Sequence, residues 1–131
     1  MNKGGSVDLG YVKITMVSAD HTSGYYDSTG MVYGGEPVGF IIKGPNYSIY
    51  HGGDTNIFAD MENIDYLYEP THLLIPIGGW YTMGPREAAL AVAKYFKSAK
   101  VVIPMHYGTL PALSGTVEEF KMNLDMLSKE F

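Results

Sequence analysis

The sequence contains no cysteine, so it can form neither a disulfide bond nor a metal site with thiolate ligands. Basic residues are also few: 9 Lys and Arg stand against 14 Asp and Glu, which gives a formal net charge of −5. They are scattered along the chain, and this argues against nucleic acid or an anionic membrane as the main partner. A metal bound by this chain would have to use histidine and carboxylate ligands.

Long hydrophobic runs are absent as well. No apolar segment approaches the ~20 residues that a membrane-spanning helix needs. No basic and apolar signal segment opens the sequence, so a cytoplasmic location is the default expectation. The length of 131 residues is enough for one domain with a buried core, and no linker divides the chain. Residues 1–131 are therefore expected to form a single domain.

The spacing of the apolar residues predicts strands that alternate with helices. Expected strands cover 11–17, 38–43, 47–51, 72–77 and 101–104, the last two of them buried. Expected helices cover 56–68, a segment opening at 84–87 and a segment opening at 116. Residues 1–10 are expected to be a loose lead-in, and 24–36 an exposed loop or β-ribbon. The buried stripe of the first helix would consist of Ile57, Met61, Ile64 and Leu67. This order favours an α/β fold with helices packed on one sheet.

Three potential metal ligands, His21, Asp54 and His106, each follow a predicted strand. If those strand ends share one rim of the sheet, two imidazoles and a carboxylate converge there, a set that suits zinc, manganese or iron. Each residue also has a simpler interpretation. Asp54 would be a helix-capping residue, His21 a turn histidine bonded to a neighbouring hydroxyl, and His106 a half-buried histidine beside Tyr107.

Four motifs occur in a fixed order. They are Val-Ser-Ala-Asp-His-Thr-Ser (17–23), Tyr-His-Gly-Gly-Asp-Thr (50–55), Ile-Pro-Ile-Gly-Gly-Trp-Tyr-Thr-Met-Gly-Pro (75–85) and Ile-Pro-Met-His-Tyr-Gly-Thr (103–109). Together they resemble the C-terminal half of the metallo-β-lactamase superfamily, and within it the metal-dependent hydrolases related to L-ascorbate-6-phosphate lactonase. The resemblance extends from about Met1 to Phe120.

The resemblance implies an αββα sandwich, of which this chain would form one mixed β-sheet with helices on one face. By position, His21 is similar to a ligand of the first metal, Asp54 to the carboxylate that bridges both metals, and His106 to the last ligand of the second. The implied cofactor is a divalent metal, with zinc favoured and manganese or iron as alternatives. Such metals activate a bridging water for attack on a lactone, ester or phosphodiester bond, which also makes Asp54 the catalytic candidate.

The glycine-rich loops around these ligands supply candidates for substrate binding. Tyr107, Gly108 and Thr109 could offer backbone N–H and hydroxyl groups to an anionic substrate, and Trp80 could shape a pocket. A plain turn closed by an aromatic side chain is the alternative for both loops.

One hallmark of the family is missing from the sequence. The His-x-His-x-Asp-His segment that supplies most ligands cannot be built from His21, His51, His72 and His106, which lie far apart. Without the other half of the sandwich, the sheet is expected to expose an apolar face and to self-associate or to pair with a complementary half-domain. A metal-dependent hydrolase is therefore the first hypothesis and a non-catalytic half-domain the second. A small-molecule or phosphate-binding module is the third.

Overall fold

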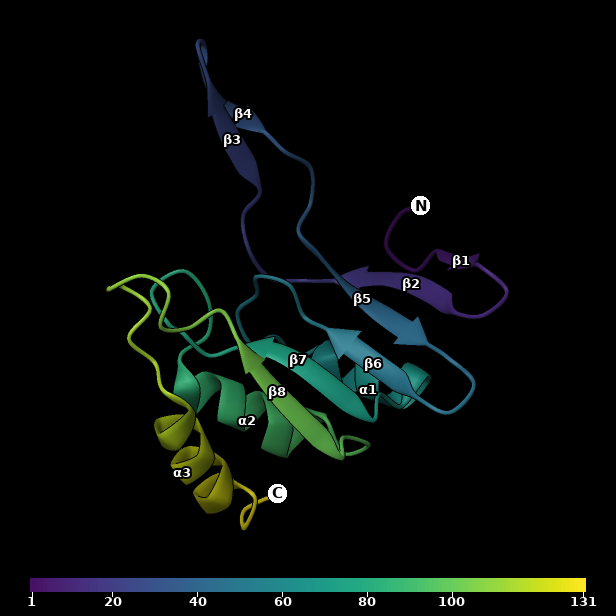
Figure 1. Cartoon of the computed structure of the whole chain (residues 1–131), viewed down its shortest axis with the longest axis vertical. Coiled ribbons are helices and arrows are strands. Elements are labelled where there is room, and N and C mark those ends of the chain that lie inside the picture. The colour runs from purple at the N-terminus through teal and green to yellow at the C-terminus, as the bar shows by residue number, and fades with distance from the viewer.

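The computed structural model describes all 131 residues and is built around one mixed sheet (Figure 1). Its strands are β1 (Ser6–Asp8), β2 (Lys13–Ser18), β5 (Val38–Lys43), β6 (Ser48–His51), β7 (His72–Pro76) and β8 (Val101–Met105). They lie in the order β1-β2-β5-β6-β7-β8. Neighbouring strands are antiparallel from β1 to β6 and parallel from β6 to β8.

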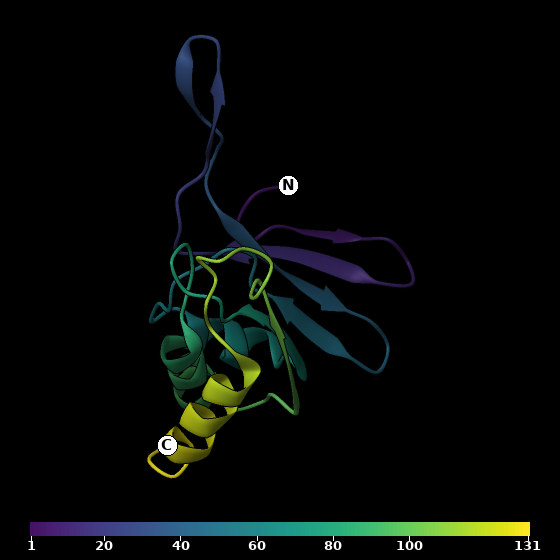
Figure 2. The same ribbon diagram turned by 60° about the vertical axis from the view of Figure 1, so that its left-hand side comes forward.

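Three helices accompany the sheet: α1 (Met61–Tyr68), α2 (Pro85–Tyr95) and α3 (Val117–Leu127). α1 joins β6 to β7 and α2 joins β7 to β8. Both connections link parallel strands, advance in the same direction across the sheet and follow the same right-handed rule, so both helices fall on one face. α3 packs on α2, and Figure 2 shows the helices on one side of the sheet. None of the three helices has the length and apolar character of a membrane span.

The core lies between the sheet and these helices. Tyr50 is fully buried on β6, and its ring stacks on Phe96 with the ring centroids 5.0 Å apart. Small side chains on α2 let the helix approach the sheet closely. The remaining core consists of Val17, Ile41, Met61, Ile64, Leu73, Ile75, Ile77, Met83, Ala88, Ala89, Ala91, Val92, Ala93, Phe120 and Leu127.

The opposite face of the sheet has no covering layer. The strand register places apolar side chains there in rows that cross five strands, because residues paired between neighbouring strands point to the same side. Apart from the imidazoles of His51 and His72, the rows contain no ionisable side chain. They comprise Ile14, Ile42, Ile49, His72 and Val101, then Met16, Phe40, His51, Leu74 and Ile103.

A second, two-stranded sheet projects from the body as a ribbon. It consists of β3 (Gly24–Asp27) and β4 (Gly30–Tyr33), which pair antiparallel only with each other. Asp27 closes the turn, because its carboxylate accepts hydrogen bonds from the N–H and the hydroxyl of Thr29. Of the two structures allowed for 24–36, the β-ribbon is therefore the one observed.

Several expected element boundaries were wrong. The lead-in contains β1, which pairs with β2, so 1–10 is not wholly irregular. Residues 56–60 are not helical, and α1 begins only at Met61. Instead, the backbone N–H of Asn56 donates a hydrogen bond to the carbonyl of Asp20, which fixes the start of this segment.

Two burial predictions also failed. Leu67 is 65% exposed, because the buried face of α1 consists of Met61, Ile64 and Asp65. β8 is the edge strand and its Val101 and Ile103 point to the uncovered face, so it is not the fully buried strand that its apolar run indicated. Predicted positions 61 and 64, on the other hand, are buried as expected.

Candidate functional site

The three predicted ligands lie at one edge of the main sheet. β2 is antiparallel to β5, and β5 to β6, so β2 runs parallel to β6, β7 and β8. The ends of these strands therefore meet at one rim. His21 lies just beyond the end of β2, Asp54 just beyond β6, and His106 directly follows β8.

Asp54 and His106 form the closest pair at this rim. The Nε2 atom of His106 lies 3.6 Å from Oδ1 of Asp54, and the two side chains are 27% and 52% exposed. The other ring nitrogen of His106, Nδ1, is buried and has no hydrogen-bond partner. This histidine thus presents one nitrogen to a carboxylate in an open site, while the other lacks the second contact that usually orients such a ring.

The backbone around the pair is tightly constrained. His106 adopts a φ of 56°, a left-handed conformation that costs a non-glycine residue energy and is concentrated at functional sites. Its carbonyl oxygen would lie 2.1 Å from a Cβ placed on Gly78, so only glycine fits beside it. Gly53 has a φ of 64° and turns the chain just before Asp54.

His21 lies in the same region but is held by backbone. Its Nδ1 is 2.7 Å from the carbonyl oxygen of Thr22, and its Nε2 is 2.8 Å from the carbonyl oxygen of Tyr81. Carbonyl oxygens only accept hydrogen bonds, so a ring N–H of His21 can donate to either of them, and both ring nitrogens face backbone oxygens rather than Asp54. The structure therefore brings Asp54 and His106 together, and leaves His21 beside them in a different set of contacts.

A polar cavity connects His21 with Asp54. It has a volume of about 400 Å³, and its wall includes the start and the end of the ribbon segment. The lining residues are His21, Thr22, Ser23, Gly24, Pro37, Val38 and Asp54. The cavity is large enough for a small polar ligand.

Thr55 joins the loops that carry these residues, a role that the sequence did not reveal. It is fully buried, and its Oγ1 accepts a hydrogen bond from the backbone N–H of Asp20 at 2.9 Å. The same hydroxyl donates to the carbonyl of Asn56. Its position next to Asp54 was the only signal in the sequence, and a hydroxyl beside a carboxylate is too common to predict a bridge between loops.

The four predicted substrate residues do not form one group. Trp80 is 80% exposed at the tip of a turn, with a φ of 63°, and packs edge-on against Tyr81, whose carbonyl contacts His21. Tyr107 and Gly108 instead line a separate cavity of about 470 Å³ at the start of α3. Thr109 is exposed and lines neither cavity.

The residues present fit part of a metal site. No group of three or more His, Asp or Glu side chains is close enough to hold an ion. The Asp54 and His106 pair does supply one carboxylate and one imidazole, donors that divalent metals of the zinc type accept. A metal held by this pair would need further ligands from outside the present arrangement.

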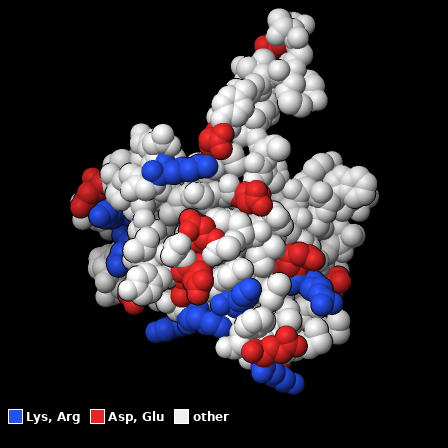
Figure 3. Space-filling view, turned by 180° about the vertical axis from the view of Figure 1, so that it is seen from behind, with Lys and Arg blue, Asp and Glu red and all other residues white.

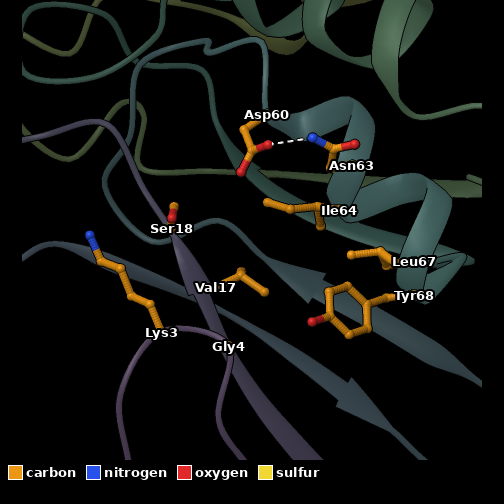
Figure 4. A pocket seen from close by; sticks show the side chains of 9 residues that line it. All are labelled: Lys3, Gly4, Val17, Ser18, Asp60, Asn63, Ile64, Leu67 and Tyr68. Carbon is orange, nitrogen blue, oxygen red and sulfur yellow. Dashed lines mark hydrogen bonds between the residues drawn. The ribbon is translucent and has the colours of Figure 1, made fainter.

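Another cavity, which shares no lining residue with the two above, lies between the N-terminal turn, β2 and α1 (Figure 4). Its volume is about 130 Å³. Asp60 there accepts a hydrogen bond from Asn63 at 2.6 Å, and Leu67 lines the wall rather than the core. It contains no histidine and brings no second carboxylate to Asp60, so we assign the candidate chemistry to the rim and not to this cavity.

Comparisons with known proteins identify the family of the chain. Residues 1–107 match the family model described as the beta-lactamase superfamily domain. The chain belongs to the metallo-β-lactamase superfamily. Its relatives include a UPF0173 metal-dependent hydrolase of Methanopyrus kandleri, 45% identical over 127 residues, and one of Solibacter usitatus, 44% identical over 131 residues. The alignments cover 97% and 99% of this chain, and 54% and 56% of those relatives.

A solved structure has a closely similar fold. Igni18, described as a metallo hydrolase from Ignicoccus hospitalis, matches with a TM-score of 0.80 and 38% identity. The match covers 96% of this chain and 52% of that structure. The chain thus spans about half the length of the relatives it matches, and the mixed sheet with helices on one face is confirmed as part of this fold.

Proposed function

We propose that this chain supplies part of the active site of a metal-dependent hydrolase, in which Asp54 and His106 hold a divalent metal. The observation that carries the proposal is the Asp54–His106 pair, with 3.6 Å between Oδ1 and Nε2, at the rim where parallel strands end. Family membership supports it, because the relatives are named metal-dependent hydrolases. Zinc is the metal we favour, with manganese or iron as alternatives.

A metal bound there would lower the pKa of a coordinated water and make it a nucleophile at neutral pH, for a lactone, ester or phosphodiester bond. The chain's own residues then have distinct tasks. Asp54, the catalytic candidate, presents a half-exposed carboxylate to the cavity. This carboxylate can accept hydrogen bonds from a bound molecule and orient it. Gly53 and Thr55 fix its direction. His106 offers Nε2 from a constrained backbone.

His21 needs a change of contacts to take part. Its Nε2 would have to leave the carbonyl of Tyr81 before it could bind a metal as a third ligand. Tyr81 follows Trp80 on an exposed turn, so a ligand that moves this turn would also release His21. We propose Trp80 as a substrate contact on this basis, and Tyr107, Gly108 and Thr109 as contacts for a larger substrate only.

The remaining ligands and the cover of the open sheet face would come from a complementary half-domain. The side chains in the rows on that face are mostly apolar, with the imidazoles of His51 and His72 as the ionisable groups, and such a face suits the inner layer of a sandwich. The relatives are nearly twice as long as the aligned region, which is room for a second layer. Self-association through the same face is the competing arrangement.

Metal content tests the ligand assignment directly. Elemental analysis after zinc loading, of the chain mixed with the part of the Methanopyrus kandleri relative that it does not match, should find metal whose amount falls in Asp54→Asn and in His106→Ala. His72→Ala is the matched control, since His72 lies on the sheet face and hydrogen-bonds Thr71. Less than one metal per several chains, unchanged by either substitution, would exclude this site.

A reconstitution experiment tests catalysis. The chain is mixed with the part of the Methanopyrus kandleri relative that it does not match, and hydrolysis of lactone and phosphodiester substrates is followed. Activity should appear only in the mixture and disappear with Asp54→Asn. Full turnover by the chain alone would contradict the shared site. Stable pairing without turnover would favour the second hypothesis, a non-catalytic half-domain.

A further inference from the structure

The ribbon of β3 and β4 projects away from the sheet and helices in both ribbon views (Figures 1 and 2). Its two strands pair only with each other, so the outer edge of each has unpaired N–H and C=O groups. Every residue of β3 is exposed, whereas β4 alternates between half-buried and exposed positions. An isolated two-stranded ribbon is only marginally stable in water, so a further partner would stabilise it.

One face of the ribbon carries three large side chains. The register pairs Tyr26 with Met31 and Gly24 with Tyr33, which places Tyr26, Met31 and Tyr33 on the same side. Their exposed fractions are 77%, 69% and 70%. Aromatic and methionine side chains gathered on so small an element are typical of interaction surfaces.

The charge of the ribbon restricts the kind of partner. No Lys or Arg occurs between Lys13 and Lys43, and Figure 3 shows the projecting ribbon without basic side chains. A phosphate backbone or an anionic membrane would find no cation there. The single charge within the strands, Asp27, is used in the turn, and the hydrogen bonds from Thr29 lower its pKa.

The edges also lack the features that prevent strand pairing. Lysine, proline and β-bulges commonly block exposed edges. Residues 24–33 contain neither lysine nor proline, and β3 pairs with β4 without a bulge. Apart from Asp27 at the end of β3, this edge carries no charge. An unblocked edge of this kind with an aromatic face is compatible with an identical edge. In a dimer with two-fold symmetry, both copies contribute the same surface to the contact, so the assembly stops at two copies.

We propose that the ribbon is a self-association element, in which β3 of one copy pairs antiparallel with β3 of a second copy. The axis passes through the middle of the strand, near Tyr25 and Tyr26, and joins the two aromatic faces into one surface. The contact is distinct from the open sheet face and independent of metal binding. It lies beside the candidate site, because Gly24, Pro37 and Val38 at the base of the ribbon line the cavity with Asp54.

Cross-linking tests the contact. Because the sequence has no cysteine, an introduced cysteine is the only thiol that can react. A Tyr26→Cys variant is treated in dilute solution with a short bifunctional maleimide, which tolerates a shift of one residue in register. Tyr66→Cys on α1 is the matched control, because it replaces the same residue type at a similar exposure of 81%. We expect dimer to form at least several-fold faster at position 26. Equal rates at both positions would overturn the proposal.

Opposite charges introduced at position 26 provide the second measurement. A cysteine introduced by Ser28→Cys at the ribbon tip is labelled with a donor dye in one sample and an acceptor dye in another. Energy transfer between the two samples reports contact between ribbons. Tyr26→Lys and Tyr26→Glu should each lose the transfer alone, and their equimolar mixture should recover it. A mixture no better than either variant alone would contradict pairing of the two ribbons, whatever the metal experiments show. Far-UV circular dichroism checks that each variant is folded.

Discussion

The hydroxyl of Thr55 accepts a hydrogen bond of 2.9 Å from the backbone N–H of Asp20, across 35 positions of the chain. This contact joins the loop that carries His21 to the loop that carries Asp54. The backbone N–H of Asn56 adds a second bond to the carbonyl of Asp20 at 2.8 Å. The relative position of two candidate ligands therefore depends on a buried hydroxyl that need not contact a metal itself.

The first prediction concerns that hydroxyl. Thr55→Val keeps the shape of the side chain but leaves the N–H of Asp20 and the carbonyl of Asn56 without their partner, so the free energy of unfolding should fall by about 1–3 kcal/mol. Thr55→Ser is the control: it keeps the hydroxyl and loses one methyl group, at a cost of roughly 1 kcal/mol. Urea denaturation measures both. A valine variant as stable as the serine variant would show that the bridge contributes little.

A second prediction concerns Gly78. A Cβ at this position would lie 2.1 Å from the carbonyl oxygen of His106, which is backbone and cannot move aside alone. Gly78→Ala should therefore lower the free energy of unfolding by about 1–3 kcal/mol, the range for overpacking. It should also displace His106 and reduce metal content.

Gly84→Ala is the control for this substitution. Its Cβ would meet only the side-chain carboxylate of Glu87, at 2.9 Å, and that side chain can rotate away. Thermal unfolding compares the two variants. Equal melting temperatures would contradict the close approach of residues 78 and 106.

The sequence predicted most of the sheet and the edge at which the candidate residues gather. Strands were predicted over 38–43 and 47–51, where β5 and β6 lie, and Asp54 and His106 lie close together at one edge of the sheet. Residues 56–60 were expected to be helical because the apolar spacing continues through them. A hydrogen bond from Asn56 to distant Asp20 overrides that local preference.

Other features depend on contacts that no local pattern contains. Whether a strand such as β8 is central or at an edge depends on the order of strands in the sheet, so its apolar run could not show that Val101 and Ile103 are exposed. The carbonyl of Tyr81 that holds His21 lies 60 positions away in the sequence. Motif position placed His21 at the right rim, but only the three-dimensional structure shows what occupies its two nitrogens.

A third prediction concerns the core. The hydroxyl of Tyr50 is buried without a hydrogen-bond partner, and burial raises the pKa of this phenol well above its ordinary value. Tyr50→Phe removes the unpaired group and keeps the ring on Phe96, so it should raise the free energy of unfolding by about 1 kcal/mol. Urea denaturation provides the measurement. A loss of stability instead would show that the hydroxyl has a partner in solution.

The last prediction concerns pH at the base of the ribbon, where the hydroxyl of Tyr33 donates to the carboxylate of Glu36. This hydrogen bond, and then the charge of Lys3 at 3.7 Å, lower the pKa of Glu36 below its ordinary value. Because the pKa is lower in the folded state, the stabilising contact is complete above the unfolded pKa and is lost as pH falls through the folded one.

Removing the donor tests this directly. Tyr33→Phe should move the pKa of Glu36 up toward that of an unperturbed glutamate. Lys3→Gln should move it less, because the hydrogen bond is the larger cause. Carboxyl resonances followed by NMR through an acid titration separate the two variants. If Lys3→Gln caused the larger shift, the ion pair rather than the tyrosine would hold the ribbon base, and Tyr33 would be free to contribute its whole ring to the face shared with Tyr26 and Met31.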